Sequence, residues 1–215
     1  MDVEIWSDIA CPWCYIGKRR FEKALAEFEH ADEVRVIWRS FELDPAAPHE
    51  RTGDRAEHLA AKYGLPVERA REMEQHVTDL AAGEGLGYRF DIARASTTFD
   101  GHRLVHLAGM HGLQDAMKER LLSAYFTEGR LISDHDTLVE LAREVGIDPD
   151  EVREMLGSDR FAQDVRTDEQ AAAQLGISGV PTFVIERRLG VSGAQPPEAL
   201  HELLREGWEQ LTAVD

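Results

Sequence analysis

The chain has 215 residues, of which 43% are apolar, so it can bury a hydrophobic core as one elaborated domain or two closely packed ones. Its formal net charge of -17 makes nucleic acid an unfavourable partner, because the phosphates would be repelled. Residues 1–20 contain no basic start followed by an apolar run, and no later stretch reaches membrane-spanning length. We therefore expect a cytoplasmic protein that binds neither nucleic acid nor a membrane.

Residues 1–44 have the pattern of a β-α-β unit. Residues 3–7 and 34–41 are rich in apolar, β-branched and aromatic side chains, which favour strands. The segment between them has apolar residues at helical spacing, namely Ile16, Phe21, Ala24, Leu25 and Phe28. A helix that connects two strands of one sheet in this way predicts a right-handed crossover and parallel strands.

Residues 45–175 form one large block that starts with the break Asp-Pro-Ala-Ala-Pro at 44–48 and has a helical pattern almost throughout from about Arg55 to Leu175. From residue 176 the pattern changes to two apolar runs, 181–185 and 189–192, which predict a β-hairpin, and a helix follows from Pro197. We therefore expect an α/β fold with one four-stranded sheet. Residues 1–44 and 176–215 form its two halves, and residues 45–175 are an inserted helical domain.

Both cysteines lie in the segment Cys11-Pro12-Trp13-Cys14, where the first strand turns into the first helix. A thiolate attacks disulfides, and the pKa of a free cysteine is about 8.5, so a useful nucleophile needs a lowered pKa. At a helix start, unpaired N–H groups and the helix dipole favour the Cys11 thiolate, and Pro12 fits the first turn. Cys14 lies one turn later on the same face. We therefore expect Cys11 to attack disulfides and Cys14 to resolve the mixed disulfide.

Two other interpretations of the cysteine pair stay open at this point. A structural disulfide would close a short loop, which constrains the unfolded chain only weakly. A zinc half-site would need two further ligands, and the chain has no second pair of cysteines. The corresponding function is a thiol- or metal-binding module without catalysis.

Val180 and Pro181 form the second candidate feature. The proline enters a predicted edge strand after a glycine-containing turn, which favours a cis peptide bond, whereas a trans proline at a strand start is the alternative. We expect the backbone of Val180 to pair with an extended substrate segment.

The chain resembles the DsbA-like branch of the thioredoxin superfamily, and most closely its FrnE-like group of cytosolic dithiol oxidoreductases. The matching segments span essentially the whole chain: residues 8–18 (Asp-Ile-Ala-Cys-Pro-Trp-Cys-Tyr-Ile-Gly-Lys), 101–104, 121–129, 179–183 and 192–195. The resemblance implies a thioredoxin-like fold with a large all-helical insertion. It also implies dithiol-disulfide exchange with protein or small-molecule substrates, by a monomer or a homodimer. The redox-active disulfide would be the only cofactor, with glutathione as a candidate co-substrate.

The helical block departs from the family pattern of Asn-Thr followed by Ala-His-Arg, since this chain has Thr97-Thr98 and then Gly101-His102-Arg103. His102 is therefore only a candidate supporting residue. It shares a helix face with His106, but no third ligand is spaced with them, so we expect no metal site.

Asp8 and Trp13 are the other candidate residues around the cysteines. Asp8 could take a proton from Cys14 or orient the turn, and a turn or capping residue is the alternative. Trp13 is expected to lie exposed as a platform for substrate, together with Pro12, and packing in the core is the alternative.

The function that these residues favour is thiol-disulfide exchange, and a cytosolic setting favours the reductase or isomerase direction. The main alternative is a glutathione-dependent isomerase or a kappa-type glutathione transferase, which resemble the same inserted architecture. Those enzymes typically use a serine where this chain has Cys11, so the retained dithiol argues against them.

Overall fold

Four short strands form one mixed sheet in the computed structural model, which describes residues 1–213. The strands are β1 (Asp2–Ser7), β2 (Arg35–Ser40), β3 (Thr182–Ile185) and β4 (Leu189–Ser192). Their order in the sheet is β2-β1-β3-β4, with β1 and β2 parallel and the other neighbouring pairs antiparallel. The predicted β-α-β unit and hairpin are confirmed, with strand ends within one residue of the expected positions. The expectation that Pro181 enters an edge strand is wrong, because β3 pairs with β1 on one side and with β4 on the other.

Helices make up most of the rest of the described chain. The first and last ones are α1 (Pro12–Ala26) and α9 (Pro197–Thr212). A short 3-10 turn, Ala31–Glu33, precedes β2. Between β2 and β3 lie α2 (Arg55–Tyr63), α3 (Val67–Gly83), α4 (Phe99–Met110), α5 (Gln114–Thr127), α6 (His135–Glu144), α7 (Pro149–Leu156) and α8 (Ala162–Gln174).

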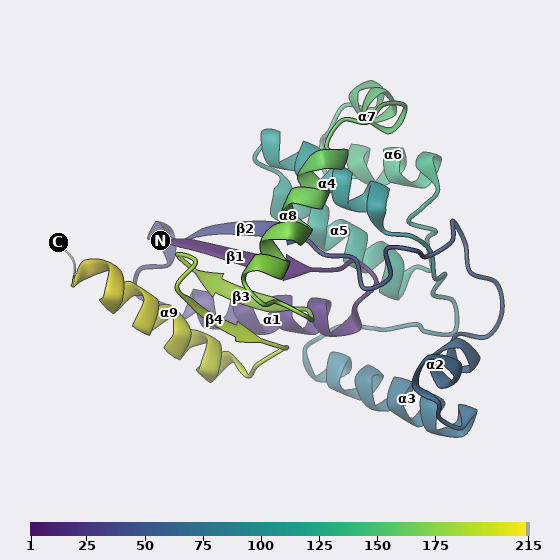
Figure 1. The fold of residues 1–215 in the computed structure, drawn as a ribbon, viewed down its shortest axis with the longest axis horizontal. Coiled ribbons are helices and arrows are strands. Elements are labelled where there is room, and N and C mark those ends of the chain that lie inside the picture. The colour runs from purple at the N-terminus through teal and green to yellow at the C-terminus, as the bar shows by residue number, and fades with distance from the viewer. Residues whose placement is uncertain (214–215) are drawn as a thin grey trace.

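Each face of the sheet is covered by helices, because successive side chains of a strand point to opposite faces. On one face, Ile5 and Phe183 join the main core, and the ring of Phe183 stacks on Phe21 of α1 at 5.4 Å. On the other face, the indole of Trp6 donates a hydrogen bond of 2.9 Å to the carbonyl of Asp168 in α8. The sheet is therefore held between α1 and α9 on one side and α8 on the other (Figure 1).

The helical block divides around the sheet. Helices α4 to α7 gather beyond β2, whereas the α2–α3 hairpin stands apart from them on the side of α1 (Figure 1). This hairpin has its own small core around Ala56, Ala60 and Ala70, and it is tied to α1 by ion pairs of Glu84 with Arg20. The predicted boundaries at 44 and 175 fall in connecting segments, while α8 lies before the second boundary and still covers the sheet. The division into an inserted domain stays a prediction.

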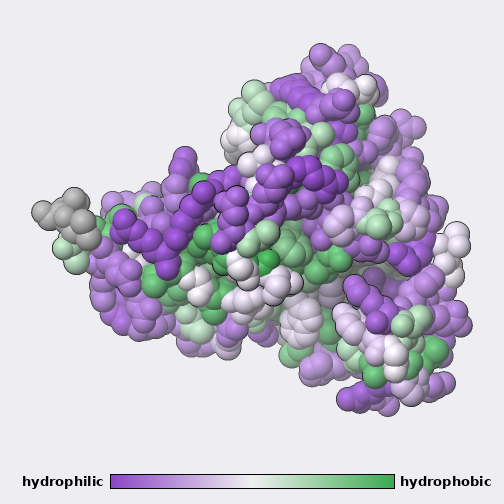
Figure 2. Space-filling view, in the orientation of Figure 1, coloured by the Kyte–Doolittle hydropathy of each residue, from purple (hydrophilic) through white to green (hydrophobic). Residues whose placement is uncertain are grey.

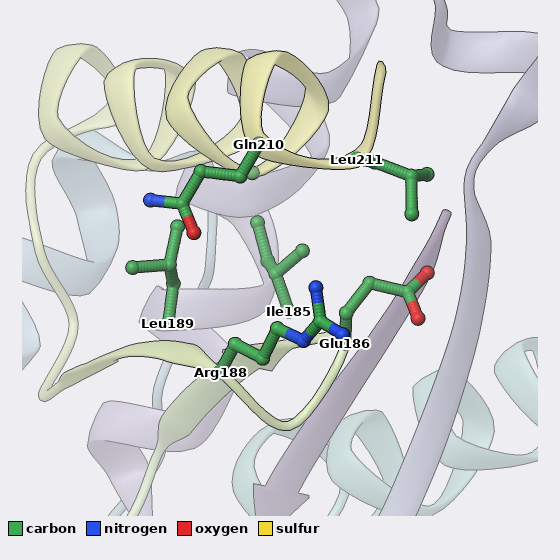
Figure 3. A pocket seen from close by; sticks show the side chains of 7 residues that line it. Ile185, Glu186, Arg188, Leu189, Gln210 and Leu211 are labelled. Carbon is green, nitrogen blue, oxygen red and sulfur yellow. The ribbon is translucent and has the colours of Figure 1, made fainter. Parts of the chain in front are cut away.

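Two further findings concern the helices and a surface pocket. No helix within residues 1–213 combines the length and the apolar character needed to cross a membrane. A small pocket lies between the β3–β4 turn and α9, at the end of β3 marked by Ile185 and Glu186 (Figure 3). It is at the opposite end of β3 from Pro181, and so it is separate from the cysteines described below.

Candidate functional site

The two cysteines lie where β1 turns into α1. Cys11 is the N-cap residue of α1 and Pro12 is its first residue, as the sequence predicts. Both cysteines are free thiols in this structure and both are buried, with exposed fractions of 4% for Cys11 and 1% for Cys14. Because Cys14 is one turn after Cys11, their thiols are close enough to form a hydrogen bond with each other.

Val180 and Pro181 lie against this dithiol, although they are almost 170 residues away in sequence. The thiol of Cys11 donates a hydrogen bond to the carbonyl oxygen of Val180, with 3.5 Å between sulfur and oxygen. The Val180-Pro181 peptide bond is cis. The ring of Pro181 packs against Gly17 of α1, where an added Cβ would lie 2.8 Å from Pro181 Cγ. A side chain at position 17 would therefore push the loop away from Cys11.

We expect Gly17→Ala to weaken both stability and exchange activity, because its new methyl group would displace Pro181 and with it Val180. Overpacking of this kind typically costs about 1 to 3 kcal/mol, against a gain of about 1 kcal/mol from the higher helix propensity of alanine. Urea unfolding and the rate of peptide disulfide reduction measure the two effects. Gly83 in α3 is the matched control, because an added Cβ there meets nothing within 4 Å. If Gly17→Ala behaves like Gly83→Ala in both assays, α1 does not position the loop.

The two thiols differ in acidity. The hydrogen bond with Cys14, followed by burial, raises the pKa of the Cys11 thiol. Burial also opposes ionisation of Cys14, but the hydrogen bond from Cys11, the charge of Lys118 and the hydroxyl of Ser7 outweigh it, so the pKa of Cys14 is lowered. This differs from the expectation that Cys11 has the lowered pKa. The reason is that the hydrogen bond with Cys14, burial and the negative charges of Cys14 and Asp8 together outweigh the backbone N–H of Cys14 at the helix start, which alone favours the Cys11 thiolate.

The two thiols are coupled, so their acidity is a property of the pair. Two coupled thiols lose their protons in two steps, and each apparent pKa describes the pair. The lowered pKa therefore does not belong to one sulfur alone. The Cys11 thiol has one proton, which it can donate to the carbonyl oxygen of Val180 or to the sulfur of Cys14. Transfer of this proton from Cys11 to Cys14 leaves a thiolate on Cys11, beside Val180.

Asp8 is the centre of a buried polar cluster behind the dithiol. Its carboxylate, 2% exposed, accepts hydrogen bonds from the backbone N–H of Leu43 at 2.8 Å and from the hydroxyl of Thr98 at 2.8 Å. His102 is also buried and lies 3.3 Å from the same carboxylate. Burial opposes ionisation of Asp8, but these hydrogen bonds, that of His102 first, lower its pKa. Burial lowers the pKa of His102. The two candidate supporting residues, Asp8 and His102, are therefore in direct contact in one buried cluster.

Asp8 also shapes the turn that presents Cys11. Its side chain accepts from the N–H of Ala10, and its carbonyl oxygen accepts from the N–H of Cys11, each at 3.3 Å. The interpretation of Asp8 as a turn residue therefore accounts for these two contacts and not for its others. Its bonds to Leu43 and Thr98 join the turn to two distant segments, and no local sequence pattern could have indicated them.

Two residues near the dithiol were not singled out from the sequence. Lys118 of α5 is 1% exposed and donates a hydrogen bond of 3.0 Å to the carbonyl oxygen of Ser7. Tyr88 donates one of 2.6 Å to the carbonyl oxygen of Pro12. The signal that could have found Lys118 is the rarity of lysine, since the chain has only four lysines against twenty arginines.

The remaining candidates lie apart from the sulfurs or at the surface. Trp13 is 37% exposed, so its side chain faces solvent beside the dithiol. His106 turns away from His102 to contact Asp168 at 3.0 Å and Ser40 at 3.1 Å. Within residues 1–213, no three His, Cys, Asp or Glu side chains are placed to hold a metal ion.

An open groove lies beside the Val180-Pro181 loop. It runs between residues 175–178, which precede the loop, and the β3–β4 hairpin, and its apolar lining includes Leu175, Ile177 and Val184. Figure 2 shows hydrophobic side chains gathered over this part of the molecule, on a face that is otherwise mostly hydrophilic. Neither cysteine lines this groove, which also includes Arg187 and Arg188, so it is a mixed polar and apolar surface along the hairpin and not part of the dithiol site itself.

The four-stranded sheet, the dithiol at the start of its first helix and the proline loop facing that dithiol define a protein of the thioredoxin class. Residues 2–205 match the DSBA-like thioredoxin domain family. The chain therefore belongs to the DsbA-like thioredoxin family, which agrees with the resemblance seen in the sequence and makes it a DsbA-like oxidoreductase.

Three comparisons describe its relatives. A crystal structure of a probable DsbA oxidoreductase from Streptomyces coelicolor is 48% identical, covers 97% of this chain and 90% of that one, and superimposes with a TM-score of 0.92. The uncharacterised Bacillus subtilis protein YwbO is 29% identical, and the match covers 85% of this chain and 86% of YwbO. The cytosolic disulfide reductase DsbM from Pseudomonas aeruginosa, solved with GSH, is 19% identical. That match covers 97% of this chain and all of DsbM, with a TM-score of 0.69, and it shows a shared fold.

Proposed function

We propose that the protein is a thiol-disulfide oxidoreductase in which Cys11 attacks the substrate and Cys14 resolves the mixed disulfide. The observation that carries the proposal is the Cys11 thiol at the start of α1, paired with Cys14 and hydrogen-bonded to Val180 at 3.5 Å. A thiol at a helix start, beside a second thiol, can exchange with an external disulfide.

The reaction balances over two steps. The Cys11 thiolate attacks one sulfur of a substrate disulfide, forms a Cys11–substrate bond and releases the other substrate sulfur as a thiolate. Cys14 then attacks Cys11 Sγ as a thiolate, forms the Cys11–Cys14 disulfide and releases the second substrate thiolate. Two electrons pass from the protein dithiol to the substrate, and the released thiolates take up protons.

Substrate binding is assigned to Pro12, Trp13, Val180 and Pro181. The exposed indole of Trp13 supplies a flat apolar surface, and Val180 supplies backbone groups next to the attacking sulfur. Pro12 and Pro181 keep the helix start and the facing loop in place. The groove along residues 175–178 gives an extended polypeptide room to continue beyond the loop.

We further propose that exchange runs in the reductase or isomerase direction in the cytoplasm, with glutathione as a co-substrate that returns the Cys11–Cys14 disulfide to the dithiol. The name of the cytosolic reductase DsbM, solved with GSH, supports this direction, since the two proteins share the fold. No further cofactor is needed, because the electron balance closes with thiols alone.

The proposal predicts that the protein catalyses glutathione-dependent reduction of a peptide disulfide. The assay follows oxidised glutathione with an enzyme-coupled readout and the released peptide thiols by alkylation. We expect stoichiometric formation of oxidised glutathione and peptide dithiol, since each turnover transfers two electrons. Glutathione that is bound but not oxidised, while a second substrate is isomerised or conjugated, would instead support the isomerase or transferase alternative.

A further inference from the structure

Lys118 is a buried lysine without a carboxylate partner among the described residues. Its side chain lies under the end of β1, where Nζ donates to the carbonyl oxygen of Ser7 and lies 5.6 Å from the centre of the Trp38 ring. A buried ammonium group is costly unless an opposite charge compensates it. Burial lowers the pKa of Lys118 to about 8, opposed first by the Cys14 sulfur and then by Asp8.

Lys18 provides a direct comparison, because its ammonium also lies near the ring of Trp38. It is 2% exposed, and its ammonium is 5.9 Å from the centre of the Trp38 ring. Unlike Lys118, Lys18 forms ion pairs with three carboxylates, those of Glu22, Asp115 and Glu119. The surroundings of Lys118 therefore lack the compensating charge that the neighbouring lysine has.

Ser7 carries a second unsatisfied group at the same place. The residue is fully buried, and its Oγ has no hydrogen-bond partner in the part of the chain that the structure describes. An unpaired buried hydroxyl is unusual and costs free energy. The hydroxyl lies beside Cys14, where a hydrogen bond to the ionised sulfur favours the thiolate. A thiolate on Cys14 would satisfy both the Ser7 hydroxyl and the charge of Lys118.

We propose that Ser7 and Lys118 form a site that binds the thiolate of Cys14, and thereby control the step in which Cys14 resolves the mixed disulfide. This inference rests on the proposed function. In the mixed disulfide, Cys14 loses its proton to solvent, and its thiolate is held by the Ser7 hydroxyl and the Lys118 ammonium. The thiolate then forms the bond to Cys11 Sγ while the bond from Cys11 to the substrate sulfur breaks, and the substrate leaves as a thiolate. Lys118 keeps its proton throughout and acts as a positioning residue.

Other charged groups set the pH range of this effect. Asp8 and Cys11 favour the charged form of Lys118, whereas Lys18 opposes it, and His102 lies close enough to Lys118 for its own ionisation to be disfavoured. Above the pKa of Lys118, about 8, the ammonium loses its proton and its support of the thiolate falls. The contribution of Lys118 should therefore be largest below pH 8.

The test compares Lys118→Met and Ser7→Ala with Lys18→Met as the matched control. In a Cys11→Ser background, Cys14 is the only thiol, and its ultraviolet thiolate absorbance against pH gives its pKa directly. We expect Lys118→Met to raise this pKa by about one unit and Ser7→Ala by a smaller amount, while Lys18→Met leaves it unchanged. With both cysteines present, Lys118→Met should slow resolution of a preformed mixed disulfide about tenfold at pH 7, and this difference should shrink above pH 9.

The first attack separates this inference from the proposed function. In a Cys14→Ser background, Lys118→Met should change the rate of adduct formation at Cys11 much less than it changes resolution. If adducts form normally but resolution and the Cys14 pKa do not respond to Lys118→Met or Ser7→Ala, the thiolate site is wrong and the exchange function stands. If the wild-type protein forms no adduct at all, the exchange function itself fails. Ser7→Ala keeps the test decisive should Lys118→Met not fold, since it removes only a hydroxyl group.

Discussion

Replacing Cys11 by serine should reduce disulfide exchange by on the order of a thousandfold or more, because a serine hydroxyl is not ionised near neutral pH and cannot form a disulfide. Cys14→Ser should behave differently. Its Cys11 can still attack, so a peptide disulfide becomes covalently attached to the protein, but no second thiol releases it. The roles of the two sulfurs are therefore expected to be asymmetric, in keeping with their positions, Cys11 against Val180 and Cys14 behind it.

Two measurements check this asymmetry. Steady-state reduction of a peptide disulfide gives the loss of turnover, and non-reducing gels or intact mass give the fraction of protein held as adduct. Because both cysteines are buried, unfolding curves of the two variants should be recorded as a control for structure. Equal reactivity of the two variants toward a disulfide reagent, or full turnover by Cys11→Ser, is incompatible with the assigned roles.

Asp8→Ala should destabilise the protein by about 3 to 5 kcal/mol, since it removes one buried carboxylate and leaves several buried donors without an acceptor. The hydroxyl of Thr98, the N–H of Leu43 and the ring of His102 would all lose their partner. A small domain has a total stability of about 5 to 15 kcal/mol, so this loss is a large part of the whole. Urea unfolding of the wild type and the variant measures it.

Asp44→Ala is the matched control, because Asp44 lies in the segment after Leu43 but at the surface, where its only side-chain ion pair among the described residues is with Arg51. Surface pairs contribute about 0 to 1 kcal/mol, so this variant should be nearly neutral. The Asp8 contribution also has a definite pH dependence. Since its pKa in the folded protein is lowered, this stabilisation is complete above the unfolded value of about 4 and is lost as the pH falls through the folded value. If Asp8→Ala lowers the free energy of unfolding no more than Asp44→Ala does, Asp8 does not join the turn before Cys11 to Leu43 and Thr98.

The fold was largely predictable from local sequence patterns. Residues 3–7 and 34–41 are rich in apolar, β-branched and aromatic side chains and 189–192 is an apolar run at hairpin spacing, and the strands lie within one residue of these positions. The position of Cys11 at the helix start follows from Pro12, because proline is tolerated in the first turn of a helix and not in its interior. These features depend on neighbouring residues, so one sequence is enough to identify them.

The electrostatics of the site could not be predicted in the same way. The acidity of the two thiols depends on their hydrogen bond with each other, on burial, and for Cys14 on the charge of Lys118, which lies more than 100 residues away in the sequence. A helix start alone predicts a lowered pKa for Cys11, and only the folded structure shows that both thiols are buried together and that a lysine lies near Cys14. From the sequence, His102 is only a candidate supporting residue without a partner, because its partner Asp8 lies 94 residues away.

The most direct test of the central claim is the identity of the sulfur that carries substrate in the wild-type protein. The reduced protein is mixed with a peptide disulfide, quenched rapidly with acid, and digested, and the peptide that contains both cysteines is fragmented in a mass spectrometer. The account predicts that the substrate is attached to Cys11, with Cys14 free. Attachment mainly to Cys14 would contradict it, because Cys14 would then be the attacking residue and the sulfur beside Val180 would be the resolving one.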